Sequence, residues 1–259
     1  ARARVKKAIE NSGIEFPDKR ITVNLAPANL PKEGSNYDLP IAIGILLAME
    51  KNGEPVIQYS STPVGDGKTV NVVGYYYGEL GLDGSVKHCR GVLLVGMLAR
   101  ENHTESVYVP VETAAEAAVI PGVVVYPVRT LLELVKHIKG EVLIEPAKTI
   151  ELLPLLDDAP PQVDMIEISG QELAKRAAEI SAAGGHNLLL VGPPGAGKTM
   201  LAKAFPSILP PLLPEESLEV TRIYSVAGML PAGTALLRRR PFRSPHPPTS
   251  MAAPTGGGR

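Results

Sequence analysis

A glycine-rich octapeptide in the second half of the chain has the residue types and spacing of a phosphate-binding loop. Residues 192–199 fit the pattern G-x-x-x-x-G-K-S/T at every required position. Glycines let several backbone N–H groups converge on one centre and so form an anion-binding nest. We expect Lys198 to reach the β- and γ-phosphates of a nucleotide and Thr199 to offer its hydroxyl to Mg²⁺. The candidate nucleotide-binding residues are Gly192, Pro193, Pro194, Gly195, Ala196, Gly197, Lys198 and Thr199, and the last two are the catalytic candidates.

The elements on either side of this loop are those that such a loop needs. Residues 187–191 form a short apolar run, typical of a strand buried on both faces of a parallel sheet. A helix is expected over 200–205. Upstream, the pattern predicts a helix over 170–182, with Ser169 as N-cap, Glu172 at the capping-box spacing and a Gly184-Gly185 stop.

Hydrolysis needs a second group that we do not find after the loop. An apolar strand ending in Asp or Asp-Glu would hold Mg²⁺ and water, but residues 220–259 contain no acidic residue at all. The same stretch carries six arginines. A solvated loop and a contact with phosphate backbone both fit such a run. The candidate DNA-contacting residues are Arg238, Arg239, Arg240 and Arg243.

The first half of the chain alternates between helical and strand patterns, which predicts an α/β fold. Helices are expected over 4–12, 39–49, 91–100, 112–118 and 130–138, with Asp38 able to cap the second. Strands are expected over 21–25, 70–82, 107–109 and 123–126. Residues 141–164 mix prolines with acidic residues, as linkers do. We therefore place one domain at 1–142, a linker at 143–164 and a second domain at 165–259.

Composition excludes several classes of protein. The chain of 259 residues has 26 basic and 27 acidic residues, so the whole chain lacks the basic charge that favours nucleic acid. Its one cysteine, Cys89, excludes an internal disulfide framework and a cysteine-rich zinc site. The longest apolar stretch, 39–49, is too short for a membrane helix, and we expect a cytoplasmic protein. Ten of the 25 prolines lie between Pro206 and Pro254, which we interpret as a loop-rich part of a nucleotide-binding domain.

Several longer strings resemble one family. Residues 186–199 are similar to the magnesium-chelatase-like AAA+ ATPases. Residues 21–34 (ITVNLAPANLPKEG), 38–42 (DLPIA) and 78–84 resemble the N-terminal domain of the ComM/YifB branch of these ATPases. Residues 219–228 (EVTRIYSVAG) and 240–246 (RPFRSPH) extend the resemblance past the phosphate-binding loop.

The resemblance implies an N-terminal domain of the ribosomal protein S5 domain 2-like fold, as in Lon proteases, followed by an AAA+ domain. It also implies ATP and Mg²⁺ as cofactors, a homo-hexamer when full length, and branched or single-stranded DNA as a partner. Members of the ComM branch are DNA branch-migration helicases used in recombination and natural transformation. Departures from the family pattern include Pro247 in place of a second histidine, and no Asp-Glu motif. We therefore expect a chain truncated at both ends that does not hydrolyse ATP alone.

Three alternatives remain open from the sequence. One is a magnesium-chelatase-type ATPase subunit, and another is a non-catalytic nucleotide-binding regulatory protein. A third is a residual protease, for which Ser35 lies one residue away from the expected nucleophile position and Lys87 lies too early. His88 and Cys89, which are adjacent, do not form a metal site by their spacing. We interpret residues 75–77, three tyrosines, as strand packing.

Overall fold

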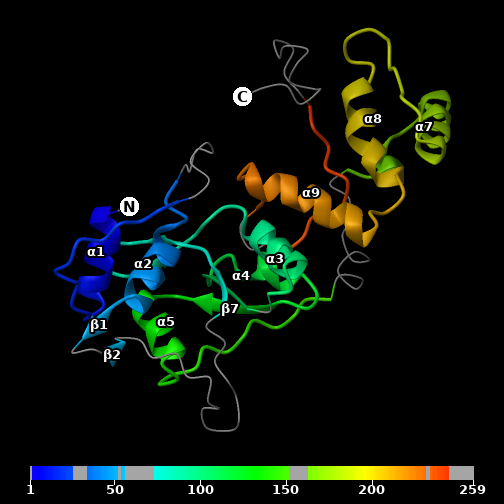
Figure 1. The fold of residues 1–259 in the computed structure, drawn as a ribbon. Coiled ribbons are helices and arrows are strands. Elements are labelled where there is room, and N and C mark those ends of the chain that lie inside the picture. Colours follow the sequence, from blue (N-terminus) through cyan, green and yellow to red (C-terminus); the bar gives the residue numbers. More distant parts are fainter. Residues whose placement is uncertain are drawn as a thin grey trace. The chain divides into compact units, whose positions relative to one another are not determined.

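The chain divides into two compact units, and one segment from the second half of the chain belongs to the first unit. The computed structural model describes residues 2–25, 34–51, 54–55, 73–104, 106–151, 163–231 and 234–244 (Figure 1). The first unit consists of residues 1–151 together with 218–236, and the second consists of 152–217 together with 237–259. The chain therefore leaves the second unit after residue 217, contributes to the first unit, and returns.

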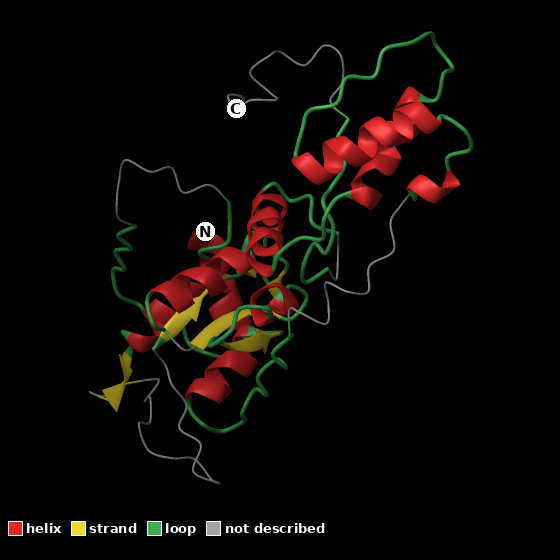
Figure 2. Ribbon diagram, turned by 90° about the vertical axis from the view of Figure 1, so that its right-hand side faces the viewer, coloured by secondary structure: helices red, strands yellow, loops and turns green. Residues whose placement is uncertain are grey.

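A three-stranded parallel sheet is the centre of the first unit. Its strands lie in the order β3 (Gly74–Tyr76), β6 (Ser106–Pro110) and β7 (Val124–Val128). Parallel neighbours need a crossover connection. Helix α3 (Val92–Glu101) lies between β3 and β6, and helix α4 (Ala114–Ala118) lies between β6 and β7. Figure 2 shows these strands with helices packed around them, which confirms the α/β fold class.

The two faces of the sheet are covered by different helices. Tyr76, Tyr108 and Tyr126 are cross-strand neighbours, and their rings stack with centroids 4.6 and 4.9 Å apart. They join the apolar core formed with α1 (Arg2–Asn11), α2 (Asp38–Leu47) and α5 (Leu131–Ile138). Alternation turns Val107 and Val125 to the opposite face, where α3 and α4 pack. Of the run 75–77, Tyr76 packs in this core, as we expected, whereas Tyr77 lies just after β3 and uses its hydroxyl in hydrogen bonds with Asn36 and the Arg90 carbonyl.

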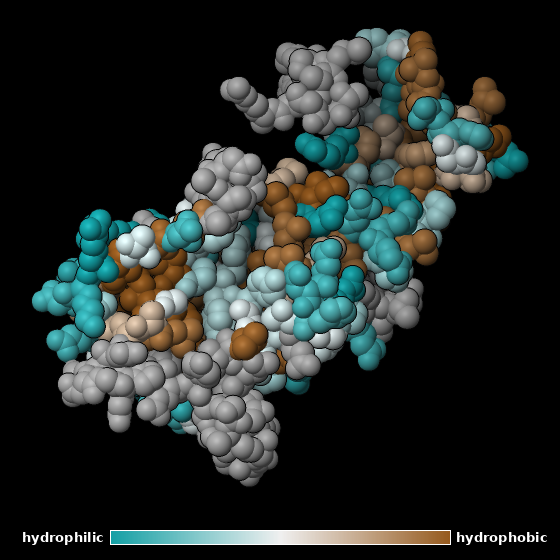
Figure 3. Space-filling view, viewed as in Figure 1, coloured by the Kyte–Doolittle hydropathy of each residue, from teal (hydrophilic) through white to brown (hydrophobic). Residues whose placement is uncertain are grey.

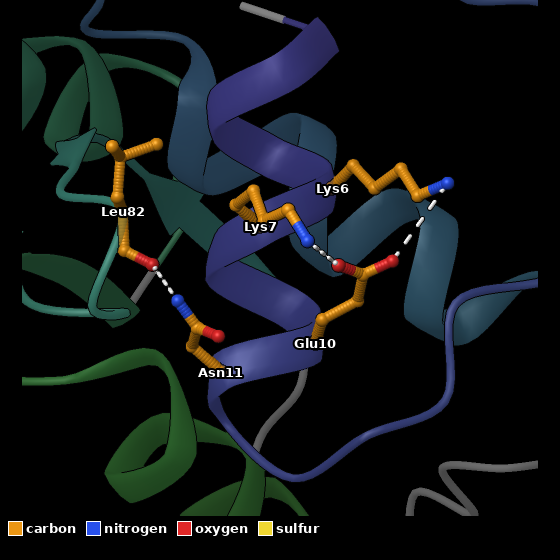
Figure 4. A network of polar contacts seen from close by, with 5 residues as sticks. All are labelled: Lys6, Lys7, Glu10, Asn11 and Leu82. Carbon is orange, nitrogen blue, oxygen red and sulfur yellow. Dashed lines mark hydrogen bonds and ion pairs between the residues drawn. The ribbon is translucent and has the colours of Figure 1, made fainter.

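Polar contacts fasten α1 to its neighbours. Arg4 Nε donates to Asp38 Oδ2 at 2.8 Å, and Asp38 is only 1% exposed. Asn11 Nδ2 donates to the Leu82 carbonyl at 2.6 Å, as Figure 4 shows. On the outer side of the same helix, Lys6 and Lys7 both pair with Glu10. Surface pairs of this kind stabilise a fold little, so the buried pair with Asp38 matters more.

Two antiparallel ribbons complete the first unit. Strands β4 (Glu79–Leu80) and β5 (Val86–Lys87) form a hairpin around the Asp83-Gly84 turn, where Gly84 has φ +81°. The pair β1 (Glu50–Lys51) and β2 (Glu54–Pro55) forms the second ribbon. The strand expected over 70–82 is therefore interrupted, because the chain turns from β3 into the hairpin. Residues 70–72 of that prediction lie outside the described residues.

The second unit contains helices and extended segments. Its elements are the 3-10 turn η1 (Met165–Glu167), α7 (Glu172–Gly184), α8 (Lys198–Ala204), η2 (Phe205–Ile208) and the first turn of α9 (Pro214–Val226). A small core gathers Met165, Ile168, Ala178, Leu201 and Ala204. Gly185, with φ +63°, follows the last residue of α7, as the Gly184-Gly185 stop predicted. No helix of the described residues is long and apolar enough to cross a membrane.

Both predicted helix caps are wrong. Asp38 does not cap α2, because its carboxylate is used by Arg4, and Tyr37 occupies the N-cap position. Helix α7 begins at Glu172 after Gln171, which has a left-handed backbone with φ +61° and makes no side-chain cap. A capping box instead lies upstream, where Asp164 is the N-cap of η1 and Glu167 accepts a hydrogen bond from the Asp164 N–H.

Two predicted strands are also wrong. Residues 21–25 and 187–191 follow extended paths, but neither pairs with a strand among the described residues. The apolar pattern was present in both, whereas a ladder also needs a neighbouring backbone to accept and donate hydrogen bonds. In the opposite sense, the proline-rich part of the chain contains α9, a helix of 13 residues that we did not predict. Residues 152–162 of the expected linker lie outside the described residues.

Candidate nucleotide-binding site

The backbone of residues 192–199 adopts a conformation that only glycine accepts easily. Gly195 and Gly197 both have φ +81°, and a Cβ added at either position would meet nothing within 4 Å. Backbone conformation rather than crowding therefore explains these two glycines. Ala196 N–H donates to the Pro193 carbonyl at 3.4 Å, which closes the turn before α8. The loop ends with Gly197 as the N-cap of that helix.

Lys198, the first residue of α8, folds its side chain back over the loop. Its Nζ donates to the Gly192 carbonyl at 2.8 Å and to the Pro193 carbonyl at 2.7 Å. The ammonium group is thus held at the mouth of the loop by two backbone acceptors. The first N–H groups of an α-helix have no acceptor within the helix. Lys198 and these N–H groups together offer positive charge and donors to an anion.

The segment that leads into the loop is fastened at one end by Ser181. This serine, which is buried near the end of α7, donates from Oγ to the His186 carbonyl at 2.6 Å. His186 N–H donates in return to the Ser181 carbonyl at 2.9 Å. The sequence patterns did not single out Ser181, because its partner is a backbone carbonyl five residues away.

Beyond His186 the segment is packed on one side only. Leu188 and Leu190 pack against the small core of the second unit. Leu189 and Val191 are each 85% exposed. Figure 3 shows apolar surface, in brown, in the part of the picture where α7 and α8 lie in Figure 1. Alternate residues of this segment therefore face the core and the solvent, as in a β-strand with one face uncovered.

The Thr199 hydroxyl is an oxygen ligand of the kind that Mg²⁺ prefers, but it supplies one ligand only. Its hydroxyl is exposed beside Lys198 at the start of α8. Mg²⁺ usually binds through few protein oxygens together with substrate phosphates and water, so one hydroxyl is compatible with the ion. No cluster of three or more histidine, cysteine or acidic side chains that could hold a metal occurs in the part of the chain that the structure describes.

The four candidate arginines are not equivalent in the structure. Arg240 donates to Glu216 Oε2 at 2.9 Å and to the Pro210 carbonyl at 3.2 Å, so it stabilises the local fold. The pKa of Glu216 is held below its usual value by the Leu213 N–H and then by Arg240. Arg238, Arg239 and Arg243 are exposed, and no carboxylate of the described residues pairs with them. Of the four candidates, these three therefore present positive charge to solvent without a carboxylate partner among the described residues.

Two family models and several curated relatives match the chain. The family model described as magnesium chelatase, subunit ChlI, matches residues 164–259, and that of subunit ChlI of Mg-chelatase matches residues 1–113. Over the whole chain, YifB of Salmonella typhimurium is 42% identical and the competence protein ComM of Haemophilus influenzae 36%. A protein of Mycobacterium tuberculosis is 40% identical over the same extent.

The chain belongs to the ComM/YifB family. This is a family of magnesium-chelatase-like AAA+ proteins, and the resemblance stated from the sequence is confirmed. The chain spans about half the length of the curated relatives it matches, since it covers 47% of the YifB protein and 48% of the ComM protein.

The residues considered for a protease do not come together as the ComM/YifB chain folds. Lys87 lies beside Gly81 and Asp83, in the β4–β5 hairpin. No hydrogen bond joins it to Ser35 in the described residues. Asn36, the residue next to Ser35, donates instead to the Tyr77 hydroxyl at 2.8 Å. A serine without a base in reach lacks the activation that nucleophilic catalysis needs.

Proposed function

We propose that this chain carries the nucleotide-binding part of an ATP- and Mg²⁺-dependent AAA+ motor that acts on DNA. The observation that carries the proposal is the loop 192–199, with two left-handed glycines and Lys198 held at its mouth. Membership of an AAA+-type ATPase family supports ATP as the nucleotide. The DNA part of the proposal rests on the exposed Arg238, Arg239 and Arg243 and on the relative named as a competence protein.

The chain's own residues have distinct parts in this proposal. The N–H groups of the loop and of the first turn of α8 bind the phosphates. Lys198 leaves the Gly192 and Pro193 carbonyls and pairs with phosphate oxygens, because a charged acceptor attracts an ammonium group more strongly than a neutral one. Thr199 supplies one oxygen to Mg²⁺, which neutralises phosphate charge when it is bound.

The organisation of the whole protein is part of the same proposal. We assign residues 1–142 to a Lon-like domain, 143–164 to a linker, and 165–259 to the N-terminal part of an AAA+ domain. The working form would be a cytoplasmic homo-hexamer on branched or single-stranded DNA. Because no Asp-Glu motif follows Thr199, the 259-residue chain is expected to bind ATP without normal turnover.

Two other functions predict different behaviour. A magnesium-chelatase-type subunit would remodel a metal-insertion partner, and its ATP hydrolysis would not respond to DNA. A non-catalytic regulatory protein would bind nucleotide, but the full-length protein would not hydrolyse it. ATPase rates of the full-length protein with and without branched DNA separate the three functions.

Replacing Lys198 tests the nucleotide site. We expect Lys198→Ala to weaken Mg·ATP binding by about 100-fold, because a charged partner of the phosphates is lost. Isothermal titration calorimetry of the 259-residue chain measures this change. The matched control is Lys203→Ala, which removes an exposed lysine from the last turn of the same helix. Equal affinities for Lys198→Ala and the unmodified chain would remove the site assignment.

A further inference from the structure

Helix α9 follows the phosphate-binding loop along the chain and ends in the other unit. Its first residues, Pro214 to Ser217, belong to the second unit, and the remainder belongs to the first unit (Figure 1). The string 219–228 was among those that carried the family resemblance, but the proposed function uses none of its residues. One continuous helix with no break at residue 217 therefore connects the chain of the nucleotide-binding unit to the first unit.

Ser225 lies near the end of α9 and is buried in a polar contact with α3 and α4 of the same unit. It is 3% exposed, accepts a hydrogen bond from Gly91 N–H at 3.1 Å, and donates from Oγ to Glu116 Oε2 at 2.8 Å. Gly91 is the N-cap of α3 and Glu116 lies in α4. One hydroxyl therefore bridges two helices that pack on the sheet.

Glu116 is placed to hold this hydroxyl. Burial raises the pKa of its carboxyl, while the Ser225 hydroxyl, the nearby His88 and the Leu93 N–H at the start of α3 lower it. A carboxylate taken from water depends on such donors, because each donor that leaves adds to the cost of burying the charge. The release of Ser225 would thus leave Glu116 with an unsatisfied oxygen.

A second contact lies one turn further on. Gly228 has φ +66°, and a Cβ added there would meet the Arg90 guanidinium, with Nε at 2.5 Å and Cζ at 2.6 Å. The Arg90 side chain therefore lies close against the backbone that follows α9. Leu218 and Leu236 bury their side chains at the two ends of the inserted segment. Apolar, polar and steric contacts together hold the described residues of this segment, 218–231 and 234–236, on the rest of the first unit.

We propose that Ser225 and Glu116 form a latch that docks α9 on the first unit, and that opening of this latch is coupled to nucleotide binding at residues 192–199. The coupling rests on the proposed function, whereas the latch itself does not. Coupling free energies are reciprocal, so nucleotide changes the latch equilibrium and the latch changes nucleotide affinity by the same factor. Glu116 and Ser225 are then positioning residues and do not touch the nucleotide.

Hydrogen exchange of residues 218–230 in the 259-residue chain measures the latch directly. Without nucleotide, Glu116→Gln and Ser225→Ala should each speed exchange of this segment by about tenfold, because a hydrogen bond to a charged group is lost. The double variant should exchange no faster than Ser225→Ala alone, since Glu116→Gln keeps an acceptor oxygen but Ser225→Ala already removes the hydroxyl that donates to it. Glu112→Gln and Glu219→Gln remove exposed carboxylates of the same region and should leave exchange unchanged. Unchanged exchange in β6 shows that each variant is folded.

Nucleotide provides the second arm of the experiment. Saturating Mg²⁺ with the non-hydrolysable analogue AMP-PNP should change exchange of residues 218–230 in the unmodified chain. Ser225→Ala should shift the dissociation constant for the same analogue by about fivefold or more. If the analogue binds but neither quantity changes, the coupling is wrong. If the analogue does not bind, the proposed nucleotide site fails and the coupling fails with it. Exchange without nucleotide then still decides whether the latch exists.

Discussion

Packing determines the protonation state of one buried side chain, His137. It is 2% exposed and lies against the rings of Tyr126 and Tyr108, at centroid distances of 4.9 and 5.7 Å. Its Nδ1 accepts the Ile144 N–H at 3.0 Å, while Nε2 has no hydrogen-bond partner among the described residues. Nδ1 as an acceptor requires the proton on Nε2, so the ring is neutral in the fold. Burial accordingly lowers its pKa from 6.5.

This histidine should make stability depend on pH. The unfolded chain binds a proton at His137 near pH 6.5, whereas the folded chain binds it only at lower pH. Stability is therefore complete above the unfolded value and is lost as pH falls below it toward the folded value. We expect His137→Asn, whose Oδ1 stands at the same position along the side chain as Nδ1 and can still accept the Ile144 N–H, to lose less stability between pH 7.5 and 5.5 than the unmodified chain. Urea denaturation at the two pH values measures the difference, and equal losses would contradict it.

At the scale of elements, helices were predicted better than strands. Helices α1, α3, α4 and α5 lie within a few residues of their expected ranges, because periodicity and glycine stops are local signals. The caps were predicted less well: α5 is capped by Thr130, whose Oγ1 accepts the Glu133 N–H at 3.1 Å, where no cap was predicted. Strands 107–109 and 123–126 were found as β6 and β7 because both run beside a strand partner. Residues 21–25 have the same alternation but no strand partner in the part of the chain that the structure describes, and a cleft of about 380 Å³ separates them from α2.

The unpaired segments should differ measurably from the sheet. Amides of residues 21–25 and 188–191 are expected to exchange with solvent much faster than those of β6, because no strand protects them in the described structure. Hydrogen exchange followed by mass spectrometry of the 259-residue chain compares these peptides in one sample. The β7 peptide serves as the protected control. Slow exchange of 188–191 would mean that this segment pairs with a strand in solution.

At the scale of the whole molecule, the balance of charge hides a local excess. The chain has a net charge of −1, yet Arg238, Arg239 and Arg243 stand exposed in a stretch without acidic residues. Arg240 belongs to the same run but is used by Glu216. The sequence grouped the four arginines because charge runs are visible in one dimension. The fold separates them because an ion pair requires a partner 24 residues away.

The DNA proposal is tested with the three exposed arginines of this run. Changing Arg238, Arg239 and Arg243 to Glu should weaken binding of the full-length protein to branched DNA and reduce the slope of log K against log salt by about 2 to 3. A matched control changes Lys19, Arg20 and Arg100 to Glu, which shifts net charge equally on exposed positions of the first unit. Fluorescence anisotropy over a salt series reads both. Equal slopes for the two triple variants would assign these arginines to a solvated loop.

Short-range chemistry was sufficient to predict a glycine turn at residues 192–199, most helices and the Asp83-Gly84 turn. Each of these depends on residues within a few positions, such as the left-handed glycines 195 and 197. The tertiary structure determined the features that depend on partners far away in the chain. It paired Asp38 with Arg4 and brought Ser225 onto Glu116, 109 positions away in the chain. It also left residues 187–191 without a partner strand among the described residues. Pattern and propensity describe what a segment is able to do, whereas a buried partner determines what it does.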